Sequence, residues 1–312
     1  MEKLQLEDFI VVKKKSRIEV DAMKMGLDWR NVLHQDIFAR VKLKYNHNSA
    51  FIYRNLEAHK ELYKSVDALR SAGLGDIIEF EEISRDKFEG KKAVVADGGD
   101  NHLIWVLDAL EYLGLDLPVI AMNATPSHSY GGLLYYNKNT IAATIGKCGE
   151  GNYEIEKWPK IEGEIESNGS RTKLFPAASE YVLGEHTGTQ MSRWVIDNEE
   201  QKGNRLIVCN GVGSSGWYSN IHIMLFGEKD TFARTSRELR HIIDGPAGHV
   251  SKYKKLHCRL LDREQLEIVS YNDERGVATA DCINEDRYIH EFLFGSVARL
   301  WVSDKASKII RC

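Results

Sequence analysis

Cysteine, proline and long apolar runs are scarce in this sequence. Its 312 residues include only 5 cysteines and 5 prolines. The cysteines stand singly, without a CxxC pair or a histidine at metal-ligand spacing, so we expect reduced thiols and no metal site of their own. They are Cys148, Cys209, Cys258, Cys282 and Cys312. No apolar run reaches the roughly 18 residues that a membrane span needs.

An excess of charge of one sign is also missing. The 42 Lys and Arg residues are balanced by 46 Asp and Glu residues, which gives a formal net charge of -4. This balance favours small molecules or proteins as partners and predicts neither a nucleic acid nor a membrane as partner. The N-terminal stretch carries Glu2, Glu7 and Asp8 and has neither an apolar secretory region nor an Arg-rich transit pattern. We therefore expect a soluble, cytoplasmic protein.

Strands and helices alternate in the first part of the chain, up to about residue 145. Short apolar runs predict strands, and longer stretches with one apolar face predict helices. The strands are predicted at 9–12, 77–80, 93–95 and 117–122, and the helices at 56–72 and 102–113. Because parallel strands need helical crossovers, the pattern predicts an α/β domain with an open parallel, Rossmann-like sheet over residues 1–145.

The pattern changes in residues 146–312, where short β-branched segments alternate with Gly, Asn and charged turns. We predict a β-rich second domain there, with the C-terminal segment as a candidate to return to the first domain. Two stretches are interpreted as helical, Trp217 to Phe226 and the region from about Ser236 to Ile243.

Gly98-Gly99-Asp100 stands where a predicted strand passes into a helix. Sites in parallel sheets lie beyond the carboxyl ends of the strands. Two glycines would let a phosphate approach the backbone, the helix would offer unpaired N–H groups, and Asp100 would accept a proton or hold a metal. The alternative is that Asp100 only caps the helix, which is what the spacing alone favours.

Asn210 to Trp217 forms a second glycine-rich stretch, between the apolar run Leu206 to Cys209 and a predicted helix. Its glycines and the hydroxyls of Ser214 and Ser215 would suit a diphosphate or a ribose, with Trp217 as a stacking surface. It is no P-loop, because the GK[ST] ending is absent. A flexible hairpin is the alternative, and the sequence leaves both open. Likewise, the lysines at 13–15 can meet phosphates or simply form a solvated strand end.

Taken in order, these pieces resemble the NAD kinase family, especially its mitochondrial branch. The GGDGT motif of that family is similar to Gly98-Gly99-Asp100-Asn101-His102, and the Asn that ends its next strand is similar to Asn123. The family's Asn-Glu-Val and TGS motifs are similar to Ser179-Glu180-Tyr181 and Val212-Gly213-Ser214. Near the N-terminus, Lys14, Ser16, Arg17 and Glu19 also follow the pattern of the branch.

The resemblance implies an α/β domain joined to a β-rich domain, with the active site in the cleft between them. It implies transfer of a phosphoryl group from ATP, with Mg²⁺, to the adenosine 2′-hydroxyl of NAD, in a homo-oligomer (dimer or tetramer). Asp100 would be the catalytic base that takes the hydroxyl proton. The implied nucleotide-binding residues are Gly98, Gly99, Asn101, His102, Asn123, Ser179, Glu180, Gly213, Ser214, Ser215 and Trp217.

The sequence departs from the family at ligand-binding positions. Asn101 and His102 replace Gly and Thr, and His102 would either carry a proton and neutralise phosphate charge or block the donor. Ser179 replaces an Asn whose amide reads a base edge from both sides. We therefore keep three hypotheses: a phosphotransferase of the NAD kinase type, a catalytically inactive nucleotide-binding homologue that acts as a sensor or partner subunit, and a kinase with a different nucleoside acceptor.

Overall fold

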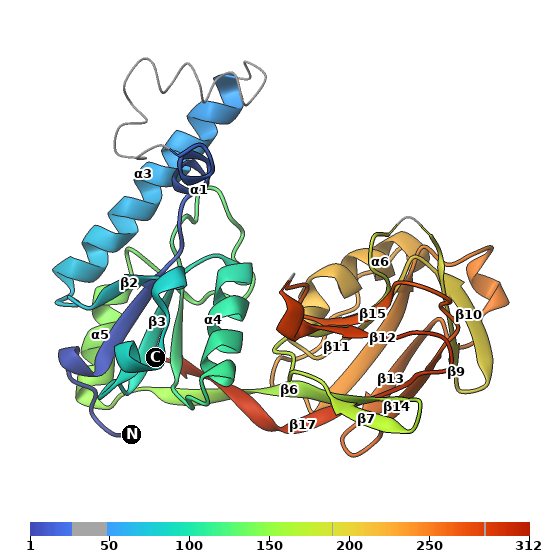
Figure 1. The fold of residues 1–312 in the computed structure, drawn as a ribbon. Helices are drawn as coiled ribbons and strands as arrows, with labels where there is room; N and C mark the ends of the chain where they lie inside the picture. Colours follow the sequence, from blue (N-terminus) through green and yellow to red (C-terminus); the bar gives the residue numbers. More distant parts are fainter. Residues whose placement is uncertain (27–48, 189, 284) are drawn as a thin grey trace. The chain divides into compact units, whose positions relative to one another are not determined.

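The computed structural model describes residues 1–26, 49–188, 190–283 and 285–312. They divide into two compact units (Figure 1). The first comprises Met1–Ile155 together with Ile309–Cys312, and the second comprises Glu156–Lys308. The first unit thus extends past residue 145, the boundary expected from the sequence, and includes the last residues of the chain.

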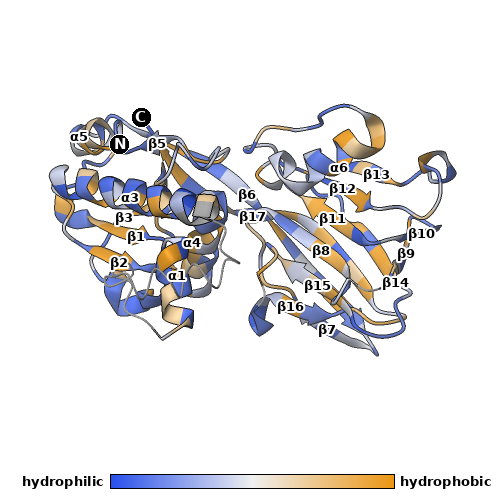
Figure 2. Ribbon diagram, turned by 90° about the horizontal axis from the view of Figure 1, so that it is seen from above, coloured by the Kyte–Doolittle hydropathy of each residue, from blue (hydrophilic) through white to orange (hydrophobic). Residues whose placement is uncertain are grey.

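The first unit is built on a parallel sheet, as the sequence predicts, and its strand order is β4-β3-β1-β2. Its strands are β1 (Phe9–Lys13), β2 (Ile77–Glu79), β3 (Ala93–Gly98) and β4 (Val119–Asn123). The end of β17 (Val297–Arg311) and the short β5 (Tyr136–Asn137) both pair with β4 in parallel. Every residue of β3 and β4 is buried, and the strands of the sheet are largely hydrophobic in Figure 2. Strands that are buried on both faces explain why these segments are continuous apolar runs.

Helices cover both faces of this sheet. They are α3 (Ser49–Ser71), α4 (Asp100–Tyr112) and α5 (Ile141–Glu150), while α1 (Arg17–Lys24) lies against α3. Leu69 of α3 and Ile145 of α5 pack in one cluster with Val95 of β3. The helix α4 lies on the other face, where its His102 contacts Gly98. Both α3 and α5 are therefore layered against the face opposite α4.

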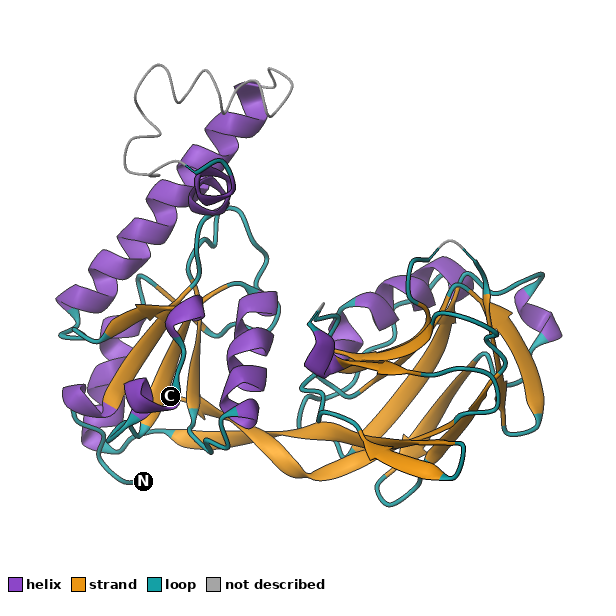
Figure 3. Ribbon diagram, viewed as in Figure 1, coloured by secondary structure: helices purple, strands orange, loops and turns teal. Residues whose placement is uncertain are grey.

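The second unit consists mainly of antiparallel strands (Figure 3). A six-stranded sheet has the order β13-β12-β11-β8-β15-β16, and a second layer has the order β10-β9-β14-β17, with β6 paired to β17 and to β7. Its other strands are β6 (Glu154–Ser167), β7 (Ser170–Lys173), β8 (Glu180–Glu185), β9 (Ser192–Ile196), β10 (Glu199–Gly203), β11 (Arg205–Cys209), β12 (Glu238–Asp244), β13 (His257–Leu261), β14 (Leu266–Ser270), β15 (Gly276–Ala280) and β16 (Ile289–Glu291).

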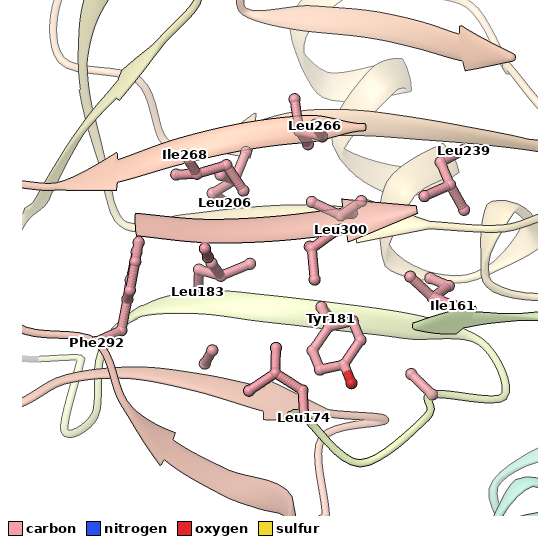
Figure 4. Packing of buried hydrophobic residues seen from close by; sticks show 14 of the residues in the cluster. Ile161, Leu174, Tyr181, Leu183, Leu206, Leu239, Leu266, Ile268, Phe292 and Leu300 are labelled. Atoms are coloured by element: carbon pink, nitrogen blue, oxygen red, sulfur yellow. The ribbon is translucent and has the colours of Figure 1, made fainter. Parts of the chain in front are cut away.

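The core of the second unit lies between these two layers (Figure 4). Leu183 and Leu206 of the six-stranded sheet belong to the same buried cluster as Ile268 and Leu300 of the other layer. On the outer face of the six-stranded sheet, α6 (Trp217–Phe226) packs its Ile221 against a smaller cluster. Two covered faces again account for continuous apolar segments such as β11.

The structure corrects one predicted element. The region from Ser236 to Ile243, interpreted as helical, contains the strand β12 instead. Leu239 and Ile243 of β12 face the main core, whereas Ile242 faces α6. Since both faces of β12 are covered, its apolar residues do not alternate clearly with polar ones, and the pattern imitates a helix. The predicted helix from Trp217 to Phe226 is confirmed.

None of the helices described is both long enough and apolar enough to cross a membrane. All five cysteines are free thiols.

Candidate functional site

The turn between β3 and α4 places Asp100 at the carboxyl end of the parallel sheet. β3 ends at Gly98, and α4 begins at Asp100 after Gly99 in the N-cap position, which forms no side-chain capping bond. Asp100 is therefore not the cap of this helix, and the simple capping interpretation is wrong. A Cβ atom on Gly98 would lie 2.3 Å from the His102 ring, so the turn requires glycine there.

The carboxylate of Asp100 is held by a neighbouring loop. One oxygen accepts a hydrogen bond from the backbone N–H of Gly132 at 2.9 Å, and the other accepts one from Leu133 at 2.8 Å. A carboxylate has about four acceptor sites, so both oxygens keep capacity for a ligand. The side chain is also partly exposed. Asp100 is thus a fixed, accessible carboxylate, which is the arrangement that a general base needs.

Asn123 shapes the same loop from the end of β4. Its Nδ2 donates to the carbonyl of Ser129 at 3.1 Å, and its Oδ1 accepts from the N–H of Thr125 at 3.1 Å. Gly131 has a φ of +61°, and a Cβ there would lie 2.4 Å from Nδ2 of Asn123. The Asn123 amide therefore forms hydrogen bonds within the loop that carries Gly132 and Leu133, the partners of Asp100.

His102 is buried and uncharged at neutral pH. Only 5% of its surface is exposed, and Nε2 lies 2.9 Å from the carbonyl oxygen of Val12. Burial lowers the pKa of His102 to about 4. A neutral ring that donates to a carbonyl brings no positive charge to a phosphate. Of the two expectations for this residue, charge neutralisation is therefore wrong.

A cavity of about 420 Å³ opens beside this turn in the first unit. It is lined by residues after β1, after β2 and at the start of α4, together with Val20 of α1 and Ser129 of the loop after β4: Lys14, Lys15, Val20, Phe80, Glu81, Gly99, Asp100, Asn101, His102, Trp105 and Ser129. Its volume lies in the range of small-molecule sites. The exposed Asn101 and the start of α4, where backbone N–H groups are unpaired, are suited to an anion.

The lysines after β1 do not form a solvated strand end. Lys13 pairs with Glu79 at 2.9 Å, and Lys15 pairs with Glu81 at 2.9 Å. Lys14 has no carboxylate within ion-pair distance among the described residues, and its Nζ donates to Oγ1 of Thr125 at 3.3 Å. Burial lowers the pKa of Lys14. Lys14 is therefore the cation on the cavity wall that is available to a phosphate.

Asp97 is a buried carboxyl group that our sequence analysis overlooked. Its side chain is fully buried, Oδ1 accepts a hydrogen bond from the Ser65 hydroxyl at 2.7 Å, and Oδ2 has no hydrogen-bond partner in the described part of the chain. Burial raises the pKa of Asp97 to about 7, against the opposing effect of Lys14 and Lys13. The signal in the sequence was a charged residue at the end of an apolar strand, immediately before Gly98.

In the second unit, Asn210 fixes the glycine-rich loop. Its Nδ2 donates to the carbonyls of Pro159 at 2.8 Å and Ala178 at 2.9 Å, and its Oδ1 accepts from Val212 at 2.9 Å and Gly213 at 3.2 Å. The loop is therefore tied down on both sides, and the interpretation as a flexible hairpin is wrong.

The two serines of this loop have different environments. Ser214 is fully buried, and its hydroxyl donates to the carbonyl of Gly211 at 2.8 Å. Ser215 is exposed. Trp217 begins α6 with 42% of its surface exposed, and the Arg205 guanidinium lies 5.4 Å from the ring centroid. Of these residues, Ser215 and Trp217 have surface that a ligand can contact.

Ser179 and Glu180 are organised by a partner that the sequence did not reveal, Asp281. Its carboxylate accepts hydrogen bonds from the backbone N–H of Ala178 at 2.6 Å and of Ser179 at 2.7 Å, and from the Ser179 hydroxyl. The Ser179 hydroxyl thus points to Asp281, in contrast to the expectation that Ser179 contacts a nucleotide. Burial and the charge of Asp281 raise the pKa of Glu180 to about 7.

Within each unit, the structure brings together some of the residues predicted from the sequence to bind a nucleotide. Those of the first unit gather at the turn after β3, whereas Glu180 and Gly213 are neighbours in the second, since a Cβ on Gly213 would lie 2.7 Å from Oε2 of Glu180.

Comparisons with known proteins identify the fold. No model of a protein family matches the sequence, and no curated protein matches it. Among solved structures, an NAD kinase from Archaeoglobus fulgidus in complex with ATP has a TM-score of 0.59 at 14% identity, over 97% of this chain and 93% of that one. Yeast NADH kinase complexed with NADH has a TM-score of 0.62 at 10% identity, over 100% of this chain and 84% of that one. The chain therefore has the fold of the NAD kinases.

Proposed function

We propose that this protein is a phosphotransferase of the NAD kinase type, which transfers a phosphoryl group from ATP with Mg²⁺ to the adenosine 2′-hydroxyl of NAD(H) or of a related nucleotide. The observation that carries the proposal is Asp100, a fixed and accessible carboxylate beside a cavity that offers helix N–H groups and Lys14. The fold shared with an NAD kinase and an NADH kinase supports it. Homo-oligomerisation and a cytoplasmic location remain predictions from the sequence.

In this mechanism the chain supplies position, charge and one proton acceptor. The donor phosphates lie against the start of α4 and the amine of Lys14, which offset their negative charge. A bond forms between the acceptor hydroxyl oxygen and the terminal phosphorus as the bond to the bridging oxygen breaks, and ADP leaves. Asp100 takes the hydroxyl proton, a step worth roughly 10²- to 10⁴-fold in rate.

A different nucleoside acceptor is the second candidate. It is favoured by Ser179, whose hydroxyl is occupied by Asp281. A hydroxyl that already donates its proton cannot donate it to an adenine nitrogen as well. An inactive nucleotide sensor is the third candidate, and the exposed side chain of Asn101 at the start of α4 favours it.

The test is turnover by the purified chain. With ATP, Mg²⁺ and NAD we expect NADP, measured by enzymatic cycling, and Asp100→Asn should lower kcat at least a hundredfold. Asp116→Asn, an exposed carboxylate in the connection between α4 and β4, is the matched control and should retain activity.

A negative result also distinguishes between the candidate functions. Absence of turnover with NAD, NADH and a panel of nucleosides would exclude a phosphotransferase. A rise in Tm with NAD, NADH, NADPH or ATP in such a protein would instead identify the sensor.

A further inference from the structure

We propose that Trp105 and Phe80 form the platform on which the base of the phosphoryl donor stacks, so that the donor is a nucleoside triphosphate accepted with little regard to its base. The inference rests on the proposed function and assigns the base to one wall of the cavity beside Asp100.

The two aromatic side chains form a single wall of that cavity. Phe80 follows β2, and Trp105 lies one turn of α4 beyond Asn101, on the same side of the helix. Their ring centroids are 6.0 Å apart with an interplanar angle of 49°. Trp105 is 43% exposed, so part of its indole surface is open to a ligand.

His102 packs against Phe80 in this wall. Its ring meets Phe80 edge to face, with centroids 5.9 Å apart and planes at 67°. The hydrogen bond to Val12 fixes the imidazole in turn. His102, which stands where the family motif has Thr, thus adds a buried ring that holds Phe80 in place. A rigid aromatic platform loses little conformational entropy when a base stacks on it.

The cavity lining also includes groups suited to phosphates. These are Lys14 and the first N–H groups of α4, and α4 rises about 6 Å between Asn101 and Trp105. A nucleotide has the same order of parts, with a charged phosphate end and an aromatic base separated by a ribose. Inorganic polyphosphate would use only the groups suited to phosphates.

The contacts available to the base favour stacking over edge recognition. The charged groups beside the aromatic wall already have partners, since Lys15 pairs with Glu79 at 3.1 Å and with Glu81 at 2.9 Å. Stacking on an aromatic side chain contributes about 1–3 kcal/mol per base and tolerates any base, because every base has a π-face. We therefore expect similar affinities for ATP and GTP and a weaker affinity for tripolyphosphate.

The experiment is calorimetric titration of the full chain with ATP, GTP and inorganic tripolyphosphate, each with Mg²⁺. Trp105→Ala should weaken ATP and GTP binding about 5- to 160-fold and leave tripolyphosphate binding unchanged. Trp105→Phe should restore most of the loss. Tyr112→Ala, an exposed aromatic on α4 outside the cavity lining, is the matched control and should change none of the three affinities.

Several results would overturn the inference: equal weakening of tripolyphosphate in Trp105→Ala, unchanged ATP affinity in that variant, or more than tenfold preference of the native chain for ATP over GTP. Turnover with an unchanged ATP affinity in Trp105→Ala would refute the platform and leave the proposed function intact. ATP binding that depends on Trp105 but never yields a phosphorylated acceptor would refute the proposed function and leave the platform intact. If ATP did not bind at all, both would fail.

Discussion

Asp97 should make the stability of the first unit depend on pH, and replacing it with Asn tests this. The side chain is fully buried, with one oxygen bonded to Ser65 and the other without a hydrogen-bond partner in the described residues. Lys13, which ends β1, and Lys14, which follows it, are the charged groups that act on it. Asn has nearly the same shape as Asp, still accepts a hydrogen bond from Ser65 and does not titrate over this range.

The magnitude follows from the difference in pKa between the two states. The pKa of Asp97 rises from 3.8 when solvated to about 7 in the folded chain. Between these values the folded state binds more protons than the unfolded state, so the free energy of unfolding falls as the pH rises through that window. It stops falling about one pH unit above 7, where Asp97 is almost fully ionised in both states. Integration over the window gives a loss of about 2.5 kcal/mol between pH 5 and pH 8.

The assay is urea unfolding of the native chain and of Asp97→Asn at pH 5, 6, 7 and 8. The buried amide of the variant adds a cost that is the same at every pH, so the informative quantity is the change in the stability difference with pH. We expect the variant to gain about 2.5 kcal/mol relative to the native chain between pH 5 and pH 8. Asp67→Asn, at an exposed position on α3, should show a constant difference. A constant difference for Asp97→Asn as well would refute the reasoning.

Two further substitutions test the loops. Gly98→Ala should destabilise the first unit by about 1–3 kcal/mol in urea unfolding and abolish turnover, because its Cβ would meet the His102 ring. Gly75→Ala, which has open space around it, should do neither. Wild-type stability of Gly98→Ala would show that the turn does not need glycine. Asn210→Ala should lower the free energy of unfolding of the second unit by about 2–4 kcal/mol, because the substitution leaves buried carbonyl and N–H groups without partners. A loss below about 0.5 kcal/mol would show that the hydrogen bonds of Asn210 do not hold the loop.

Local patterns in the sequence predicted elements whose signals lie within a few residues. The helix α6 was located correctly because Gly216 and Gly227 bracket an apolar stretch that ends in the left-handed C-cap typical of glycine. The strand β12 was missed because burial on both faces erases the alternation on which a strand prediction depends. The parallel sheet and the β-rich second unit followed from the same kind of local evidence.

Local sequence patterns could not predict the hydrogen bonds that organise the site. Asp281 is about a hundred residues from Ser179 and Glu180 in the chain, and no local spacing connects them. The same holds for His102, whose burial depends on a carbonyl of β1 that is 90 residues away. A side chain's chemical type is visible in a sequence, whereas the direction in which it points depends on such distant partners.

The directions in which these side chains point determine how the replacements at the family's motif positions affect function. His102 points to β1 and Phe80, and Ser179 points to Asp281, so both serve the scaffold rather than a ligand. Among the described residues of the first unit, the polar groups available to a ligand include the Asp100 carboxylate, the Lys14 amine and the backbone at the start of α4. Phosphoryl transfer depends mainly on positioning and on the neutralisation of charge. The replaced residues therefore bear more on which nucleotides bind than on whether the transfer can take place, and loss of activity in Asp100→Asn is the result on which the proposed function depends.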